Sequence, residues 1–445
     1  MDIKKLNRGY RKIISDHPAD SYQDYLRALK AVEDSSAYYK GKPVDFLYQA
    51  LFFSKEHLLQ LQYLSSTLVK ILKKVIAEYR NNPIFRRNFP FSSLMEELIL
   101  IDPGYLYDFP IARFDIFYPY NQHAKFCELN ADGSSAMNEV RVIEAVMRAT
   151  RPFKILDKTH HFAGFELFYS WITVLLANYQ QYKQGEQERP NIAIVDFKDE
   201  GTINEFKEFQ QRLIASGYQT VICDPRELKY NRGKLYYQDS HIQLIYRRAT
   251  TVRLLEEATD IADFIQAYRD GAVCVVGGLR SQIIHNKVIF AILHDQGATP
   301  FLEREEREFI QRHIPFTQVL KDNSSEMLNH LLEQKDSLVL KPFDQAASKG
   351  VYVGRDYTSE QWRSLILASQ GKDYLLQEFV EIPQMGMATV DQKKARIYFE
   401  DYGYLIGMFL YNQQLQGLYT RAGRQNIIGA VAESYTVPNF VVSEE

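Results

Sequence analysis

The sequence predicts a protein of mixed α/β and α+β class with several domains. Residues 160–300 alternate short apolar runs with amphipathic helical segments, which predicts a parallel Rossmann-like sheet. Residues 301–445 carry six further strand-like runs, typical of an α+β unit. The first 100 residues instead show apolar side chains at three- and four-residue spacing, which predicts helices. A length of 445 residues fits roughly two to four domains.

Composition excludes several classes of protein. A net charge of −3, from 53 basic and 56 acidic residues, gives no broad basic field for nucleic acid. No apolar run approaches the ~18 residues of a membrane-spanning helix. Cys127, Cys223 and Cys274 lie far apart and form no CxxC pair, so we expect reduced thiols rather than a zinc site or disulfides. We therefore expect a cytoplasmic protein that binds neither nucleic acid nor membrane.

The N-terminal region, residues 1–100, is expected to be helical. Leucine, isoleucine and valine recur from Leu51 to Ile76 at helical spacing, and Asn82 and Pro83 end the pattern.

Residues 101–150 predict a β-hairpin with a polar face. Two strand-like runs, Ile111–Phe117 and residues 124–130, flank a turn with Pro119 and Asn121. Residues two apart share one face of a strand. If the strands pair, their polar side chains converge, which suits Mg²⁺ and phosphate. These side chains are Arg113, Asp115, Glu128 and Asn130. The alternative is an ordinary solvated hairpin face.

Residues 151–300 are expected to form a Rossmann-like substrate domain. A helix is predicted over 161–181 and another over 202–216, with strands at 191–196, 218–223, 234–237, 242–246 and 272–276. No GxGxxG occurs, so this fold does not imply NAD. Arg247 and Arg248 follow a strand at the sheet edge where ligands gather, so we expect them to contact an anionic substrate. Structural salt bridges are the alternative.

Residues 301–445 contain three candidate ligand segments. Strands are predicted at 338–342, 350–353, 374–380, 395–399, 405–411 and 415–420. The loop 343–349, between Lys341 and Gly350, can fold over phosphates, although it is not a Walker A loop. Residues 374–380 run towards Pro383 and could read an adenine edge. Arg421 follows a strand and lies among glycines, and an arginine in that setting suits contact with phosphate. The alternatives are a plain connection between strands for the loop 343–349, a core strand for residues 374–380 and a surface turn for Arg421.

Together these segments resemble the circularly permuted ATP-grasp proteins, most closely the glutathionylspermidine synthase-like group. RFD (113–115) and ELN (128–130) come first, then the α/β segment, then the lysine–proline strand and its loop. In an unpermuted ATP-grasp enzyme the metal-ligand strands come last. The resemblance covers residues 105–430. The segment 279–293, and a helix at 303–312 followed by Pro315 and Thr317, also fit the family.

The resemblance implies a role for each matching residue, with ATP and Mg²⁺ as cofactors. Arg113 would contact the transferring phosphate and stabilise the transition state. The metal ligands would be Asp115, Glu128 and Asn130. The phosphate-binding residues would be Lys287, Lys341 and Arg421, covered by Ala347, Ser348, Lys349 and Gly350. The adenine hinge would be Gln377, Glu378, Phe379 and Val380. Residues 101–150 and 301–445 would together form the ATP-binding domain.

The implied activity is an ADP-forming ligation of small-molecule or peptide substrates. ATP would phosphorylate a carboxylate, and an amine or thiol would attack the acyl phosphate. This chemistry needs no protein nucleophile, in agreement with the absence of GxSxG and HExxH. The loop DQAASKG has one glycine where relatives often have more. No amidase domain is expected, so the resemblance leaves only synthetase-type chemistry. A kinase-like or regulatory ATP-binding protein, and a binding protein with a decayed site, are the alternatives.

Overall fold

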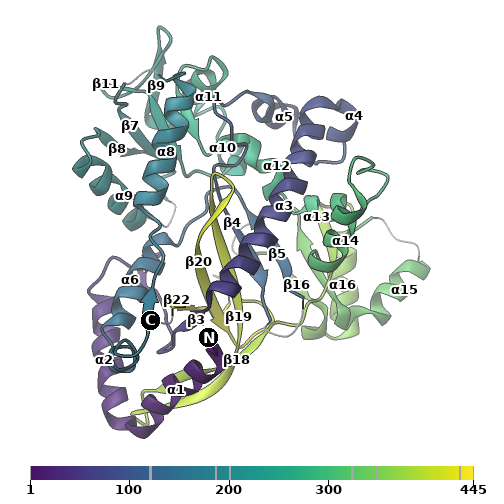
Figure 1. Cartoon of the computed structure of the whole chain (residues 1–445). Helices are drawn as coiled ribbons and strands as arrows, with labels where there is room; N and C mark the ends of the chain where they lie inside the picture. Colours follow the sequence, from purple (N-terminus) through teal and green to yellow (C-terminus); the bar gives the residue numbers. More distant parts are fainter. Residues whose placement is uncertain are drawn as a thin grey trace.

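A computed structural model gives the architecture of residues 2–119, 123–185, 188–199, 202–321, 325–345, 348–429 and 432–443. Figure 1 shows a long twisted sheet in the middle of the molecule, an α/β unit above it, the first two helices of the chain below it and a smaller unit to the right.

The N-terminal region is mainly helical, as predicted. Leu51, however, lies in a buried strand, β3, that pairs with β22 near the other end of the chain, so the long helix α3 starts only at Lys55. Ser54 caps α3, because its hydroxyl accepts the His57 N–H at 3.4 Å while the His57 ring accepts the Ser54 N–H at 3.2 Å. The elements are α1 (Ile3–Asp16), α2 (Pro18–Glu33), β1 (Tyr38–Tyr39), β2 (Lys42–Pro43), β3 (Leu51–Phe53), α3 (Lys55–Asn81), α4 (Pro83–Arg86) and α5 (Ser93–Leu100).

The central sheet joins strands from both halves of the chain. Its order is β21-β20-β19-β4-β5, with β18 also paired to β19, and all pairs are antiparallel. The hairpin predicted at 111–117 and 124–130 is confirmed as β4 and β5, and it pairs directly with β19. Two predicted strands, 395–399 and 405–411, are one continuous strand. The bounds are β4 (Ile111–Phe117), β5 (Lys125–Asn130), β18 (Gln384–Asp391), β19 (Arg396–Tyr411), β20 (Gln414–Gly423) and β21 (Tyr435–Val437).

The α/β unit contains the predicted parallel sheet, but the strand predicted at 234–237 is not part of it: this strand, β10, lies in a separate antiparallel sheet, β11-β10-β9, because it pairs with its neighbours in the chain. The strand order of the parallel sheet is β13-β12-β7-β8, so β7, its first strand in the sequence, lies in the interior of the sheet. The helix predicted at 161–181 begins only at Tyr169, because residues 161–163 form a strand that pairs with β22. The elements are α6 (Met137–Arg148), α7 (Arg151–Leu156), β6 (His161–Ala163), α8 (Tyr169–Tyr182), β7 (Ile192–Val195), α9 (Ile203–Ala215), β8 (Thr220–Cys223), β9 (Leu228–Asn231), β10 (Lys234–Tyr237), β11 (Ser240–Ile242), β12 (Leu244–Arg247), α10 (Thr251–Glu256), α11 (Ala262–Arg269) and β13 (Cys274–Val276).

A smaller antiparallel sheet, β14-β17-β15-β16, lies beside the central sheet. It contains the predicted lysine–proline strand as β15. The remaining elements are α12 (Gln282–His285), α13 (Val288–His294), α14 (Arg304–His313), β14 (Thr317–Val319), α15 (Ser325–Glu333), β15 (Leu338–Pro342), β16 (Tyr352–Val353), α16 (Ser359–Ser369), β17 (Tyr374–Glu378) and β22 (Asn439–Ser443).

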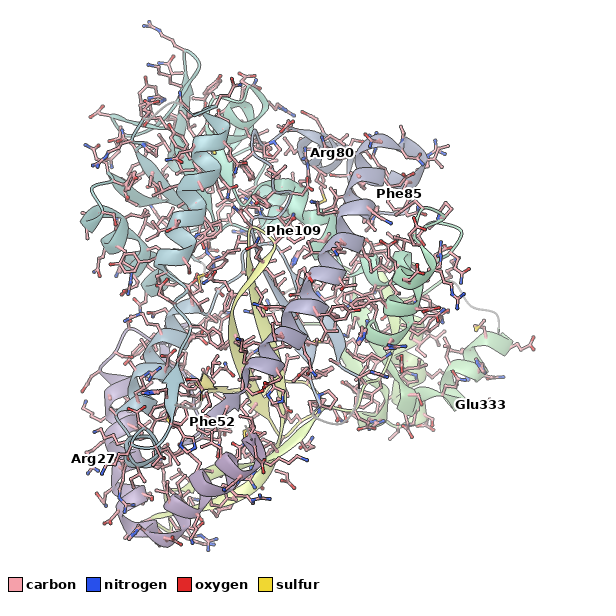
Figure 2. The ribbon with its side chains drawn as sticks, in the orientation of Figure 1. Arg27, Phe52, Arg80, Phe85, Phe109 and Glu333 are labelled. Atoms are coloured by element: carbon pink, nitrogen blue, oxygen red, sulfur yellow. The ribbon has the colours of Figure 1, made fainter. Side chains whose placement is uncertain are left out.

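Aromatic side chains fill the cores between these units. Phe52 and Phe109 are buried, whereas Arg27, Arg80 and Glu333 lie at the surface (Figure 2). The abundance of Phe and Tyr in the sequence therefore reflects core packing in large part. In the described part of the chain, no helix is both long enough and apolar enough to cross a membrane.

Candidate active site

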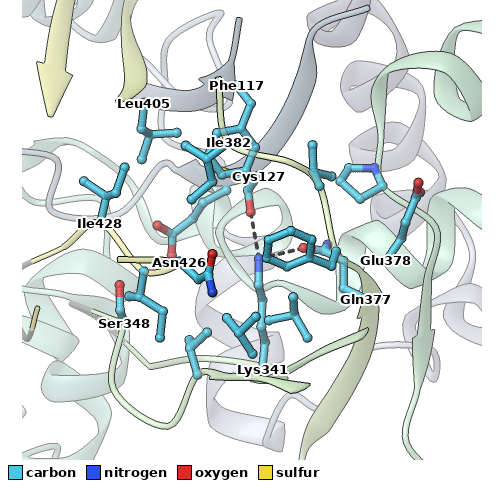
Figure 3. Close-up of a pocket in the computed structure, with 18 of the residues that line it drawn as sticks. Phe117, Cys127, Lys341, Ser348, Gln377, Glu378, Ile382, Leu405, Asn426 and Ile428 are labelled. Atoms are coloured by element: carbon cyan, nitrogen blue, oxygen red, sulfur yellow. Dashed lines mark hydrogen bonds between the residues drawn. The ribbon is translucent and has the colours of Figure 1, made fainter. Parts of the chain in front are cut away.

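A pocket lies between the small sheet and the central sheet (Figure 3). One part of its wall is apolar: Phe117, Val339, Val351, Val353, Phe379, Val380, Ile382, Leu405, Ile427 and Ile428. The other part is polar and includes three cations, Lys287, Lys341 and Arg421. Its remaining members are Glu128, Ser348, Gln377, Glu378 and Asn426. An apolar slot beside a cationic wall suits a planar heterocycle that carries anionic groups.

Lys341 reaches across the pocket from the small sheet to the central sheet. Its ammonium donates to Gln377 Oε1 at 2.6 Å and to the Cys127 carbonyl at 3.4 Å (Figure 3). Burial lowers the pKa of Lys341, because the charged form loses hydration. An anionic ligand would restore a favourable environment for this charge.

The end of β17 leaves one backbone donor in the apolar part of the pocket. The Glu378 N–H donates to the Phe316 carbonyl and the Phe379 N–H to the Ser337 carbonyl, both at 2.8 Å. The Val380 N–H has no acceptor among the described residues, and Val380 lines the pocket. This geometry is suited to one hydrogen bond with a base edge.

The hairpin β4–β5 brings its predicted polar residues together. The sheet register pairs Asp115 with Glu128 and Arg113 with Asn130. The Asn130 amide donates to Asp115 Oδ2 at 3.1 Å and to Glu128 Oε2 at 3.3 Å, so the two carboxylates converge on one amide. Burial alone would raise the pKa of Glu128, but Lys287, 2.9 Å from Oε1, holds that pKa well below its usual range.

Two arginines hold Asp115, which is fully buried. Arg113 Nε lies 2.9 Å from Oδ1, and Arg421 lies 2.6 Å from Oδ2. Arg113 also donates to the Ser135 carbonyl at 2.9 Å and lies 5.5 Å from the Tyr419 ring centroid. The guanidinium groups are therefore fixed in place before any ligand arrives.

The donor set of this hairpin fits Mg²⁺. The described residues contain no group of three or more His, Cys, Asp and Glu side chains arranged for a metal ion. Asp115, Glu128 and Asn130 supply two carboxylates and an amide, and Mg²⁺ commonly binds one or two carboxylates and takes its other ligands from phosphates and water. Because Asp115 Oδ2 already accepts from Arg113, Arg421 and Asn130, a bound cation would displace at least one of these donors.

The pocket and hairpin together carry more positive than negative charge. Glu378, a third carboxylate that lines the pocket, is balanced by Lys125 of the hairpin at 3.7 Å. The other two carboxylates, Asp115 and Glu128, face four cations. These cations are Arg113, Lys287, Lys341 and Arg421. The excess of two positive charges would be balanced by an anion with two net negative charges.

The loop after β15 lies at the open rim of the pocket. Ser348 and Gly350 have positive φ angles of 59° and 69°, and together with Lys349 they line a second pocket that adjoins the first at Ser348, Val351 and residues 426–427. Lys349 is exposed. Ala347, expected to cover the phosphates, lies outside the described residues.

Arg247 and Arg248 do not line either pocket. Both are buried: Arg247 lies 2.6 Å from Asp132 and Arg248 lies 3.5 Å from Glu205. Arg248 also donates to the Ser134 carbonyl, and a Cβ on Gly133 would lie 2.9 Å from the Arg248 carbonyl oxygen. The chain's own residues 131–136 thus occupy the sheet edge where we expected an anionic substrate, and the structural salt bridges are present instead.

Gly407, which was not among the predicted site residues, faces the hairpin from β19. Gly407 pairs with Asp115, and a Cβ at this position would lie 2.7 Å from Arg113 Cδ and 2.9 Å from Asp115 Oδ1. Only glycine leaves room for both side chains. An isolated glycine inside an apolar strand, YLIGMFLY, indicates such a close approach.

The chain belongs to the circularly permuted ATP-grasp type 2 family, whose model matches residues 144–405. This range includes Lys287, Lys341 and residues 377–380, whereas the β4–β5 hairpin precedes it. Among curated proteins, no relative of this chain is detected.

Three solved structures match this chain, and the first of them shares its fold. A glutathione synthetase-like effector, GSS30 from Globodera pallida in its apo form, is 11% identical with a TM-score of 0.59, over 94% of this chain and 96% of that chain. D-alanyl-alanine synthetase A from Vibrio cholerae is 11% identical, over 58% of this chain and 89% of that chain, with a TM-score of 0.29. D-cycloserine synthetase DcsG is 11% identical, over 57% of this chain and 92% of that chain, with a TM-score of 0.30.

Proposed function

We propose that this protein is an ATP- and Mg²⁺-dependent ligase that joins a carboxylate to an amine or a thiol. The observation that carries the proposal is a pocket in which an apolar slot adjoins a cluster with two excess positive charges. ATP bound to Mg²⁺ has a planar base and two net negative charges, so it matches both parts of the pocket. Family membership supports the same nucleotide.

Each part of the site then has a role. The adenine would lie in the apolar slot, with its edge against Gln377 and the Val380 N–H. The cations Lys287, Lys341 and Arg421 would bind the phosphates. Ser348, Lys349 and Gly350 are at the rim and would cover them. Mg²⁺, held by Asp115, Glu128 and Asn130, would neutralise phosphate charge.

The proposed reaction balances in two steps. A substrate carboxylate oxygen attacks the γ-phosphorus of ATP, and the bond to the β,γ-bridging oxygen breaks and releases ADP. The amine or thiol then attacks the carbonyl carbon, phosphate leaves, and the nucleophile loses one proton. Arg113, already fixed by Asp115 and the Ser135 carbonyl, would neutralise charge on the transferring phosphoryl group. Positioning and charge neutralisation would supply the catalysis.

We place the substrate-binding part in the α/β unit within residues 151–300 and the reaction in the cytoplasm. Residues 101–150 and 301–445 would form the ATP-binding part, since β4 and β5 share one sheet with β18–β21. The three cysteines form no disulfide, in agreement with a reducing compartment.

An ADP-release screen tests the proposed function. Carboxylates are combined with amines, amino acids, thiols and peptides in the presence of ATP and Mg²⁺. We expect ADP release to require a carboxylate, and hydroxylamine to trap the acyl phosphate as a hydroxamate. A stable phosphorylated product formed without a second substrate would show a kinase. If ATP with Mg²⁺ gave neither ADP nor a thermal shift, the protein would be a binding protein with a decayed site.

Replacing Gly407 by alanine is expected to lower ADP release by about 10- to 100-fold, because the new Cβ displaces Arg113 and Asp115. The measurement is the steady-state rate at saturating ATP, with a melting curve to confirm folding. Gly9→Ala is the matched control, because a Cβ at Gly9 meets no atom within 4 Å. Equal rates for the two variants would place the reacting groups away from β19.

A further inference from the structure

A chain of hydrogen bonds crosses three neighbouring strands of the small sheet. The Thr317 hydroxyl donates to the Pro315 carbonyl at 2.8 Å, Gln377 Nε2 donates to Thr317 Oγ1 at 2.9 Å, and Lys341 donates to Gln377 Oε1 at 2.6 Å. The register of the strands explains this alignment. Thr317 on β14 lies opposite Gln377 on β17, and so does Val339 on β15, two residues before Lys341. The last link of the chain lies in the pocket (Figure 3).

The two ends of this chain fix the orientation of the Gln377 amide. A threonine hydroxyl has one hydrogen, and Thr317 gives it to Pro315, so towards Gln377 it can only accept. An ammonium group can only donate, so Lys341 requires the amide oxygen. If the amide were reversed, its oxygen would face the Thr317 oxygen and its NH₂ group would face the Lys341 ammonium. Thr317 and Gln377 are 2% and 4% exposed, so water could do little to relieve these contacts.

A fixed amide presents an acceptor, not a donor, to the pocket. Gln377 Oε1 has two lone pairs, and Lys341 uses one of them. The other suits a donor such as the 6-amino group of a purine, whereas the oxygen of a 6-oxo purine would repel it. When Lys341 turns towards phosphates, its bond to Oε1 weakens, and Thr317 is then the restraint that keeps the amide in place.

We propose that Thr317 is a positioning residue which, through the Gln377 amide, makes the pocket select a 6-amino purine over a 6-oxo purine. This inference rests on the proposed nucleotide-binding function. It gives a role to Thr317, which lies behind Gln377 and does not itself line the pocket.

The experiment compares dissociation constants of ATP and ITP for the full-length protein with Mg²⁺ present. We expect the wild type to prefer ATP by at least about 10-fold. Thr317→Val should lower this preference by about 3- to 10-fold, and Thr317→Ser, which keeps the hydroxyl, should preserve it. Thr420→Val is the matched control, because Thr420 is a fully buried threonine whose hydroxyl donates to Asn439 at 2.7 Å outside the pocket lining.

A second variant tests the route through the amide. In Gln377→Glu both side-chain oxygens are acceptors, so no amide orientation remains to be fixed. Adding Thr317→Val to this variant should therefore leave the ATP-to-ITP ratio unchanged. An unchanged ratio in Thr317→Val alone, or an equal loss in the Gln377→Glu background, would overturn the inference and leave the proposed function intact. Failure of the wild type to bind either nucleotide would overturn the proposed function itself.

Discussion

Replacing Asp115 by asparagine is expected to lower ADP release by at least about 100-fold, because the variant loses the charge at the centre of the proposed phosphoryl-transfer site. Asp115 is fully buried and accepts from Arg113, Asn130 and Arg421. Asparagine keeps the volume of the side chain, so the hairpin should still form. The two guanidinium groups lose their shared carboxylate, and the proposed Mg²⁺ site would lose one of its two anionic ligands.

The measurement is the rate of ADP release as a function of Mg²⁺ concentration. Asp115→Asn should require a much higher Mg²⁺ concentration for half-maximal activity. It should also melt below the wild type, because two largely buried guanidinium groups lose their carboxylate, so rates are compared at a temperature where both proteins are folded. Asp391→Asn, on β18 of the same sheet and outside the pocket lining, is the matched control and should keep the wild-type dependence. An identical Mg²⁺ dependence in Asp115→Asn would place the metal away from this hairpin.

Local patterns in the sequence predict the elements that carry the site. Alternation of polar and apolar residues is enough to find β4 and β5, and the apolar run before Lys341 is enough to find β15. The pairing of β4 with β19 depends instead on contacts between distant parts of the chain. The resemblance to a permuted family implied this joining of the two segments, and periodicity alone did not.

Errors in the predicted elements have the same physical cause. Residues 161–163 carry a helical pattern but form a strand, because β22 offers them an antiparallel partner. The sequence predicts separate strands at 395–399 and 405–411, yet β18 pairs with residues 396–403 and the strand continues between them. Tertiary pairing overrides local propensity in both places.

The candidate site shows where prediction from sequence ends. Lys287, Lys341, Gln377 and Arg421 come from four segments, and the structure brings them into one pocket. Thr317 gains its role only from the register of β14 with β17. Arg247 and Arg248 lie at the sheet edge as expected, but filling of that edge by residues 131–136 is a tertiary event that no local pattern reports.

The largest effect on stability is expected from Asp132→Ala, which should lower the free energy of unfolding by about 3–5 kcal/mol. Asp132 and Arg247 form a pair at 2.6 Å in which each side chain is only 1% exposed, and Asp132 also accepts the Thr251 N–H at 2.6 Å. Among the described residues, removing the carboxylate leaves the buried guanidinium with the backbone carbonyls of Gly277, Gly278 and Ala249 as its remaining acceptors. Urea unfolding, followed by circular dichroism, measures the loss.

The comparison with an exposed pair separates burial from mere contact. Lys30 and Asp34 are nearly as close, at 2.7 Å, but both are exposed, so Asp34→Ala should leave the urea midpoint nearly unchanged. Replacing both buried partners, by Asp132→Leu with Arg247→Met, should recover most of the lost stability, because no uncompensated charge then remains in the interior. If the double variant were as unstable as Asp132→Ala, the loss would come instead from the Thr251 contact and from the position of residues 131–136 on the parallel sheet.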